Sequence, residues 1–143
     1  MNKEWSVLNK LTRRQDEIYH RCAVNAGISD TKFWILYAIC ESGGALCQNA
    51  ICQDWFCSKQ TVSTAVAGLE RDGILHLQFA AGSKKQKNLQ LTAKGELFCD
   101  KHIRSVLNAE CRALSSLPEP LRQAYLSTRE KLLEVLEQEL QKA

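Results

Sequence analysis

The chain has 143 residues, 45% of them hydrophobic and 24% charged, with a formal net charge of +3 at pH 7. This is enough apolar material for one folded domain, so we expect a globular chain rather than a disordered one, and so small a charge does not by itself indicate a nucleic-acid partner. No stretch approaches the roughly 18 apolar residues of a transmembrane helix, and the amino terminus lacks the apolar segment of a signal peptide. We therefore expect a cytoplasmic chain with no membrane partner.

Hydrophobic periodicity, capping residues and glycine stops predict the elements in chain order. They are a helix over 3–25 ended by Gly27, a helix from Ser29 that stops before Gly43, a short helix over 46–54, a helix over 58–72, strands over 74–80 and 89–91 around a polar tip, a helix from Thr92 to Leu117, and a last helix after Pro120.

A short helix, a brief turn and a longer helix have the spacing of a helix-turn-helix, and the β-hairpin that follows has the place of a wing. The fold class predicted is therefore mainly α with a small β-hairpin wing: a winged helix-turn-helix flanked by long helices.

The helix over 58–72 has two contrasting faces. Val62, Val66 and Leu69 fall together at 100° per residue and form the expected core face. The opposite face and its flank are polar and lack bulky apolar groups, so they fit a DNA major groove, where Gln, Ser, Thr and Lys can contact base edges or phosphates. A solvated helix face is the ordinary alternative. The candidate DNA contacts in this helix are Ser58, Lys59, Gln60, Thr61, Ser63, Thr64 and Arg71.

The hairpin tip, within a wing over 80–90, carries Lys84, Lys85 and Lys87. A cationic tip beside a helix of this kind indicates a second contact with DNA phosphates, which would make binding strongly dependent on salt. A solvated turn is the alternative.

The sequences AICQDWFCSKQTVSTAVAGLERDGIL (50–75) and LQLTAKGELF (89–98) resemble the MarR family of multiple antibiotic resistance regulators. The resemblance implies one MarR-like domain over 1–143, with a winged helix-turn-helix lobe at 29–98 and a helical dimerisation region at 1–28 and 99–143. It further implies a transcription regulator, typically a repressor, that binds a pseudo-palindromic operator in double-stranded DNA as a homodimer, and a small ligand that weakens this binding.

The chain departs from the family pattern in three places. The wing has Ser83-Lys84-Lys85 where the family often has Asp-x-Arg, so we expect phosphate contacts there rather than base reading, because lysine lacks the planar fork of arginine. Phe56 occupies a turn position that often holds Gly, and would be strained if φ there is positive. Thr64 stands where the family frequently has Arg, which moves the expected base recognition to Gln60 and Ser63.

Apolar stripes on the first and last helices predict the dimer interface. Its expected residues are Trp5, Leu8, Leu11, Leu121, Tyr125, Leu132, Leu136 and Leu140. The expected effector pocket, between the dimer helices and the DNA-binding lobe, has as candidates Tyr19, His20, Trp34, Phe98 and His102.

Seven cysteines in one chain are many, and we expect them to be reduced and mostly packed as small hydrophobic residues. The spacing of five between Cys47, Cys52 and Cys57 does not suit zinc, so neither a metal nor a cofactor is expected. Redox sensing is an alternative, with Cys57 at the start of the helix over 58–72 as one candidate. Cys22, in the first helix, is the other, although it does not clearly match the sensing cysteine of peroxide-responsive family members.

A winged helix can also mediate protein interactions without binding DNA, which is a further alternative that the basic wing disfavours. An enzyme is not expected, because the sequence has no recognisable nucleophile beside a general base, no phosphate-binding glycine loop and no pair of carboxylates at a recognisable spacing.

Overall fold

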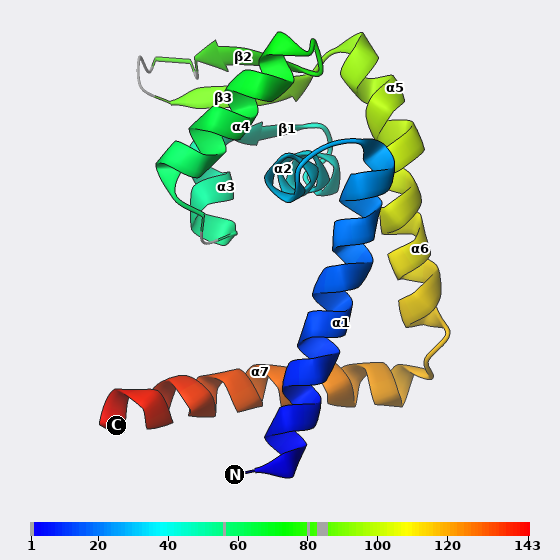
Figure 1. Ribbon diagram of the computed structural model, residues 1–143, viewed down its shortest axis with the longest axis vertical. Helices are drawn as coiled ribbons and strands as arrows, with labels where there is room; N and C mark the ends of the chain where they lie inside the picture. Colours follow the sequence, from blue (N-terminus) through cyan, green and yellow to red (C-terminus); the bar gives the residue numbers. More distant parts are fainter. Residues whose placement is uncertain (1, 56, 80, 83–85) are drawn as a thin grey trace. The chain divides into compact units, whose positions relative to one another are not determined.

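The computed structural model describes residues 2–55, 57–79, 81–82 and 86–143. It confirms a mainly helical fold with a small antiparallel sheet (Figure 1). The chain forms two compact units, one up to Leu107 and one over Asn108–Ala143. The elements are α1 (Lys3–Ala26), α2 (Asp30–Glu41), β1 (Ala45–Cys47), α3 (Gln48–Asp54), α4 (Lys59–Arg71), β2 (Leu75–Phe79), β3 (Lys87–Leu91), α5 (Ala93–His102), α6 (Arg104–Ser115) and α7 (Glu119–Lys142).

The helices α1 and α2 begin at capping side chains, and α1 ends at a glycine. Asn2 Oδ1 accepts a hydrogen bond of 2.9 Å from the Glu4 amide at the start of α1, and Ser29 Oγ accepts one of 3.2 Å from the Lys32 amide at the start of α2. Gly27 ends α1 in the left-handed conformation with a φ of 74°, which glycine adopts without strain.

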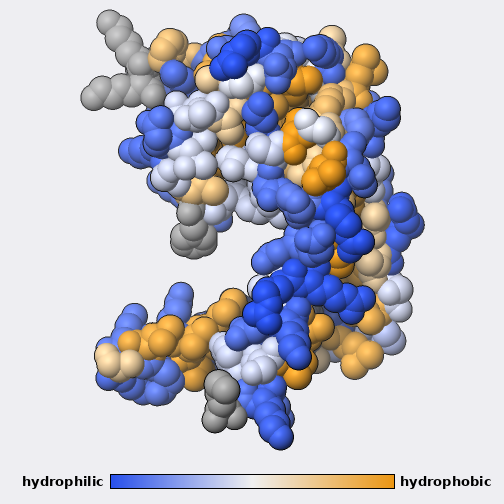
Figure 2. Space-filling view, in the orientation of Figure 1, coloured by the Kyte–Doolittle hydropathy of each residue, from blue (hydrophilic) through white to orange (hydrophobic). Residues whose placement is uncertain are grey.

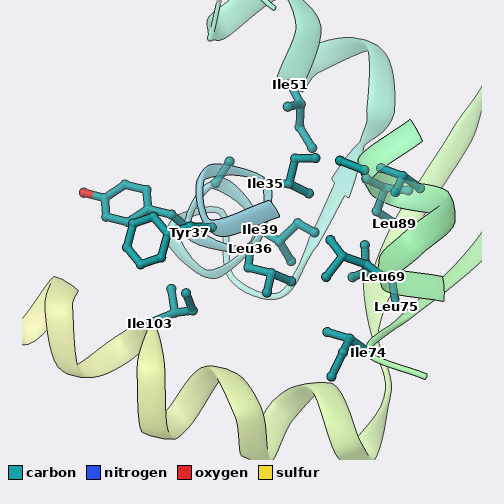
Figure 3. Packing of buried hydrophobic residues seen from close by; sticks show 14 of the residues in the cluster. Ile35, Leu36, Tyr37, Ile39, Ile51, Leu69, Ile74, Leu75, Leu89 and Ile103 are labelled. Atoms are coloured by element: carbon teal, nitrogen blue, oxygen red, sulfur yellow. The ribbon is translucent and has the colours of Figure 1, made fainter. Parts of the chain in front are cut away.

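The core of the first unit is built around α2, which Figure 3 shows end-on among its neighbours. Ile35, Leu36 and Ile39 are at most 1% exposed and pack with buried residues of α3, α4 and the strands. Ile103 reaches the same cluster from the turn after α5. The apolar helix interior at 33–40 therefore crosses the core.

The sheet has the order β1-β3-β2, so the strand before α3 pairs with the second strand of the hairpin. Leu46 is opposite Leu89 in the β1–β3 pair, and Leu77 is opposite the same Leu89 in the β2–β3 pair. The prediction of a helix from residue 46 is wrong at Leu46 and Cys47, because backbone pairing with β3 holds these residues extended; α3 begins at Gln48.

The single helix predicted from Thr92 to Leu117 is also wrong, because it is interrupted at Ile103. Ile103 is fully buried, and its φ of −110° and ψ of −55° depart from regular helix geometry. The interruption separates α5, which buries Gly95 and Cys99, from α6, which has no buried residue.

The second unit consists of the end of α6 and the 24-residue helix α7, and no residue of α7 is buried. Hydrophobic side chains lie on the visible surface of α7 in Figure 2. Of the residues predicted for a dimer interface, Leu121, Tyr125, Leu132 and Leu140 are 39–64% exposed, and Leu136 is partly exposed. In the first unit, Leu8 and Leu11 are exposed and Trp5 is partly exposed.

Across the residues that the structure describes, no helix combines the length and the apolar character required to span a membrane.

Candidate nucleic-acid interface

The helix α4 has one face in the core and one in solvent. Val62, Val66 and Leu69 are at most 2% exposed, which confirms the predicted core face. At its start, Ser58 has extended backbone geometry and its Oγ accepts a hydrogen bond of 3.1 Å from the Thr61 amide. This cap satisfies one of the free amides of the first turn and fixes where the helix begins.

The seven residues predicted to contact DNA from this region, 58–61, 63–64 and 71, are all exposed. Gln60 and Thr64 bond within the helix: the Thr64 hydroxyl donates to the Gln60 carbonyl at 3.0 Å, and Gln60 Nε2 donates to Thr64 Oγ1 at 3.4 Å. The Ser58 hydroxyl donates to Thr61 Oγ1 at 2.7 Å. In the free chain the Ser58 and Thr61 hydroxyls are thus occupied in the cap, whereas the Gln60 amide is held by one long hydrogen bond that a base edge can replace.

A groove of about 540 Å³ lies between α4 and the start of α2. It is lined by Ser29, Thr31, Lys32, Gln60, Thr61, Thr64, Ala65, Gly68 and Arg71. Lys32, which sequence reasoning missed, belongs to this surface; its Nζ lies 3.9 Å from Asp72 Oδ2. Nothing in the local pattern of α2 distinguishes Lys32 from an ordinary surface lysine, because only the packing of α2 against α4 brings it to the groove.

A second groove, of about 230 Å³, lies on another side of α4, against α3 and β3. Its lining residues are Gln48, Asn49, Cys52, Lys59, Ser63 and Lys87. The structure thus brings together Lys59, Ser63 and Lys87, which were predicted separately from the helix and the wing. Gln48 Oε1 is buried in this region and has no hydrogen-bond partner among the described residues.

The wing is described only in part. Lys87 is exposed at the first position of β3. Lys84 and Lys85, with Ser83, lie outside the described residues, as does Phe56, so the expectations for the lysine tip and for a strained turn stay predictions.

The residues predicted for an effector pocket lie in separate groups of side-chain contacts. The Tyr19 and Trp34 rings lie 4.8 Å apart, within an aromatic cluster that also contains Tyr37 and Trp55, and the Phe98 and His102 rings lie 4.7 Å apart. Neither pair lines the grooves described above. The effector pocket therefore stays a prediction.

The two histidines of this set have opposite electrostatic surroundings. His20 Nδ1 lies 2.9 Å from Asp30 Oδ1, and this hydrogen bond, with the negative charge of Asp30, raises the pKa of His20. Burial and the nearby charge of Lys101 lower the pKa of His102. At pH 7 the structure therefore favours protonation at His20 more than at His102.

The comparisons with known proteins agree with the fold. Residues 26–86 match the sequence model of the MarR family, which confirms the resemblance seen in the sequence. No curated protein matched the chain.

Several solved structures share the fold. A MarR family regulator from Neisseria meningitidis, NMB1585, is 19% identical, with a TM-score of 0.80 over 99% of each chain. A putative MarR family transcriptional regulator from Listeria monocytogenes, complexed with a 26mer DNA, is 22% identical, with a TM-score of 0.73 over 97% of this chain and 92% of that one. S. aureus MepR, in a complex with DNA, is 19% identical, with a TM-score of 0.71 over 95% of this chain and 99% of that one.

Proposed function

We propose that this chain, which has the MarR fold and matches the MarR family over residues 26–86, is a regulator of transcription that binds double-stranded DNA sequence-specifically as a homodimer. The observation that carries the proposal is the exposed polar face of α4, with a cation-bearing groove on two of its sides. Two relatives of the same fold are described in complexes with DNA. The proposed role is non-enzymatic and repressive, and it places the protein in the cytoplasm with the DNA.

In this role α4 enters the major groove, where a short polar side chain near the start of the helix can reach base edges. Gln60 and Ser63 are the proposed base-reading residues, because both are exposed and lie in the first half of α4. Lys59 and Lys87 are the proposed phosphate contacts, because they line one groove together and a positive charge there neutralises the backbone.

The proposal of a dimer rests on the second unit. Helices in proteins are stabilised mostly by packing of an apolar face, and α7 buries none of its residues although it exposes Leu121, Leu132 and Leu140. A second copy of the chain would cover this apolar surface and would give the two-fold symmetry that a pseudo-palindromic operator requires. Light scattering at micromolar concentration tests this step, and the mass of a monomer would refute it.

The test of DNA binding is selection from a random duplex library at about 0.15 M salt, followed by sequencing of the bound fraction. We expect an inverted repeat with half-sites about one helical turn apart. A library without enrichment, bound with no dependence on salt, would refute DNA reading and favour a protein-interaction module.

Variants separate base reading from phosphate binding. Gln60→Ala should cost about 1 to 3 kcal/mol and relax the preference at one position of each half-site. Lys87→Ala should weaken binding to all sequences alike and lower the salt slope by about one per subunit. Lys101→Ala, which removes an exposed lysine of α5 away from both grooves, is the charge-matched control and should change neither quantity.

A further inference from the structure

A lysine of α2 lies across the helix α4, and the function proposed above assigns it no role. The end of the Lys32 side chain lies over Gly68, where a Cβ built on the glycine would be 2.9 Å from both Cε and Nζ of the lysine. Lys32 Nζ also lies 3.9 Å from Asp72 Oδ2, just after the same helix. The ammonium group therefore occupies the space that a side chain at position 68 would fill.

This lysine is held more closely than an ordinary surface lysine. The Lys32 side chain is 26% exposed, whereas those of Lys131 and Lys142, which also form ion pairs, are 72% and 69% exposed. A side chain that is already ordered loses less conformational entropy when it binds a partner. The contact with Asp72 is long and its carboxylate is well exposed, so a phosphate oxygen can replace that carboxylate at little cost.

The two grooves beside α4 lie on opposite flanks of its exposed face. At 100° per residue, Ser63 lies on one flank of Gln60 and Gly68 lies on the other. The groove beside Gly68 contains the cations Lys32 and Arg71, and the groove beside Ser63 contains two lysines. A helix that enters the major groove has one sugar-phosphate backbone on each side of it. Each backbone would therefore face a groove with two cations.

We infer that Lys32 binds a phosphate of the DNA strand on the side of α4 away from Lys59 and Lys87, and that Gly68 provides the space for its ammonium group. This inference rests on the proposed DNA binding, and it adds a residue from outside the helix-turn-helix of α3 and α4. Phosphate contacts set the orientation of a protein on the duplex. Contacts on both strands would fix the rotation of α4 in the major groove, and with it the direction in which Gln60 meets the base edges.

The first test measures the salt dependence of binding to a labelled duplex of mixed sequence, with the full-length protein. Lys32→Ala should weaken binding by about threefold to tenfold for each subunit at about 0.15 M salt, and it should lower the salt slope by about one per subunit. Lys101→Ala, which removes an exposed lysine away from both grooves, is the charge-matched control and should change neither quantity. A parent protein that binds no duplex would refute the proposed function itself. A parent that binds, with a slope that Lys32→Ala leaves unchanged, would overturn this inference alone.

A second variant tests the role of Gly68 without removing any charge. Gly68→Ala places a methyl group where the end of Lys32 lies, so it should weaken DNA binding although the helix stays folded. The same change made in the Lys32→Ala protein should have no further effect, because the displaced group is already absent. An equal loss of affinity in both backgrounds would show that Gly68 does not act through Lys32.

The strand assignment is tested with uncharged methylphosphonates placed at single positions of the inverted repeat that the library selection recovers. A methylphosphonate weakens binding of the parent protein wherever it replaces a contacted phosphate. Lys32→Ala should abolish this sensitivity at a phosphate on one strand, and Lys87→Ala should abolish it at a phosphate on the other strand across the same major groove. Loss of sensitivity on the same strand in both variants would overturn the assignment.

Discussion

Replacing Gly95 with alanine should destabilise the protein, because Gly95 lies where α5 meets the turn before β2. A Cβ built on Gly95 would lie 2.1 Å from the Ile74 carbonyl oxygen and 3.1 Å from its carbon. The Ile74 oxygen also accepts a hydrogen bond of 3.1 Å from the Thr92 amide, and Lys94 Nζ donates to the Asp72 carbonyl at 2.8 Å. Neither backbone segment can therefore move away without breaking contacts that join them.

The size of the effect follows from two opposing contributions. Alanine is better than glycine in a helix by up to about 1 kcal/mol, whereas overpacking of a well-packed site costs about 1 to 3 kcal/mol and sometimes more. A clash with backbone belongs at the upper end, so we expect the free energy of unfolding to fall by about 2 kcal/mol or more. The melting temperature should fall by about 6 °C or more.

Gly68→Ala is the matched control in another helix. Its Cβ would meet the Lys32 side chain, with Cε and Nζ at 2.9 Å, and the end of a flexible side chain can rotate away. We expect this variant to be neutral or more stable by up to about 1 kcal/mol. Urea unfolding at one fixed protein concentration measures both variants. Equal stability of Gly95→Ala and the parent, or an equal loss in both variants, would refute the reasoning.

Three further predictions concern the cap, a titrating contact and the dimer. Ser58→Ala should lower the free energy of unfolding by about 0.5 to 2 kcal/mol in urea titrations, because it removes the acceptor of the Thr61 amide; unchanged stability would mean that the cap contributes nothing. Because Asp30 raises the pKa of His20, their contact contributes stability below the ordinary imidazole pKa of about 6.5 and loses it as pH rises through the raised value. His20→Ala should therefore lower the melting temperature more at pH 5.5 than at pH 8.5, and the reverse order would contradict this assignment. Leu132→Glu should raise the dimer dissociation constant at least tenfold in sedimentation experiments, whereas an unchanged constant would exclude this face of α7 from the interface.

Elements with local signals were predicted well from the sequence. The capping side chains of Asn2, Ser29 and Ser58 and the stop at Gly27 identify helix ends through interactions within a few residues, although Asn2 was not singled out beforehand. The buried and exposed faces of α4 follow from helical periodicity alone, so the candidate surface could be drawn before the structure was known.

The errors arise where distant residues decide the conformation. Leu46 and Cys47 are extended because β3, which begins at Lys87, pairs with them, and no local pattern in the sequence predicts this pairing. The interruption at Ile103 has neither a glycine nor a proline beside it, and Lys32 reaches its groove only through the packing of α2 on α4.

The pairing of β1 with β3 limits how far the proposed DNA-binding surface can adapt its shape to the DNA. Because β1 runs directly into α3, and β3 begins with Lys87, the sheet ties the wing to the helix-turn-helix through backbone hydrogen bonds. The distance between the two proposed DNA contacts, the helix-turn-helix and the wing, would then be fixed. Duplexes whose local groove width matches that distance would bind without deformation, while stiff sequences of a different width would have to bend first. Sequence preference would extend in this way to base pairs that no side chain touches.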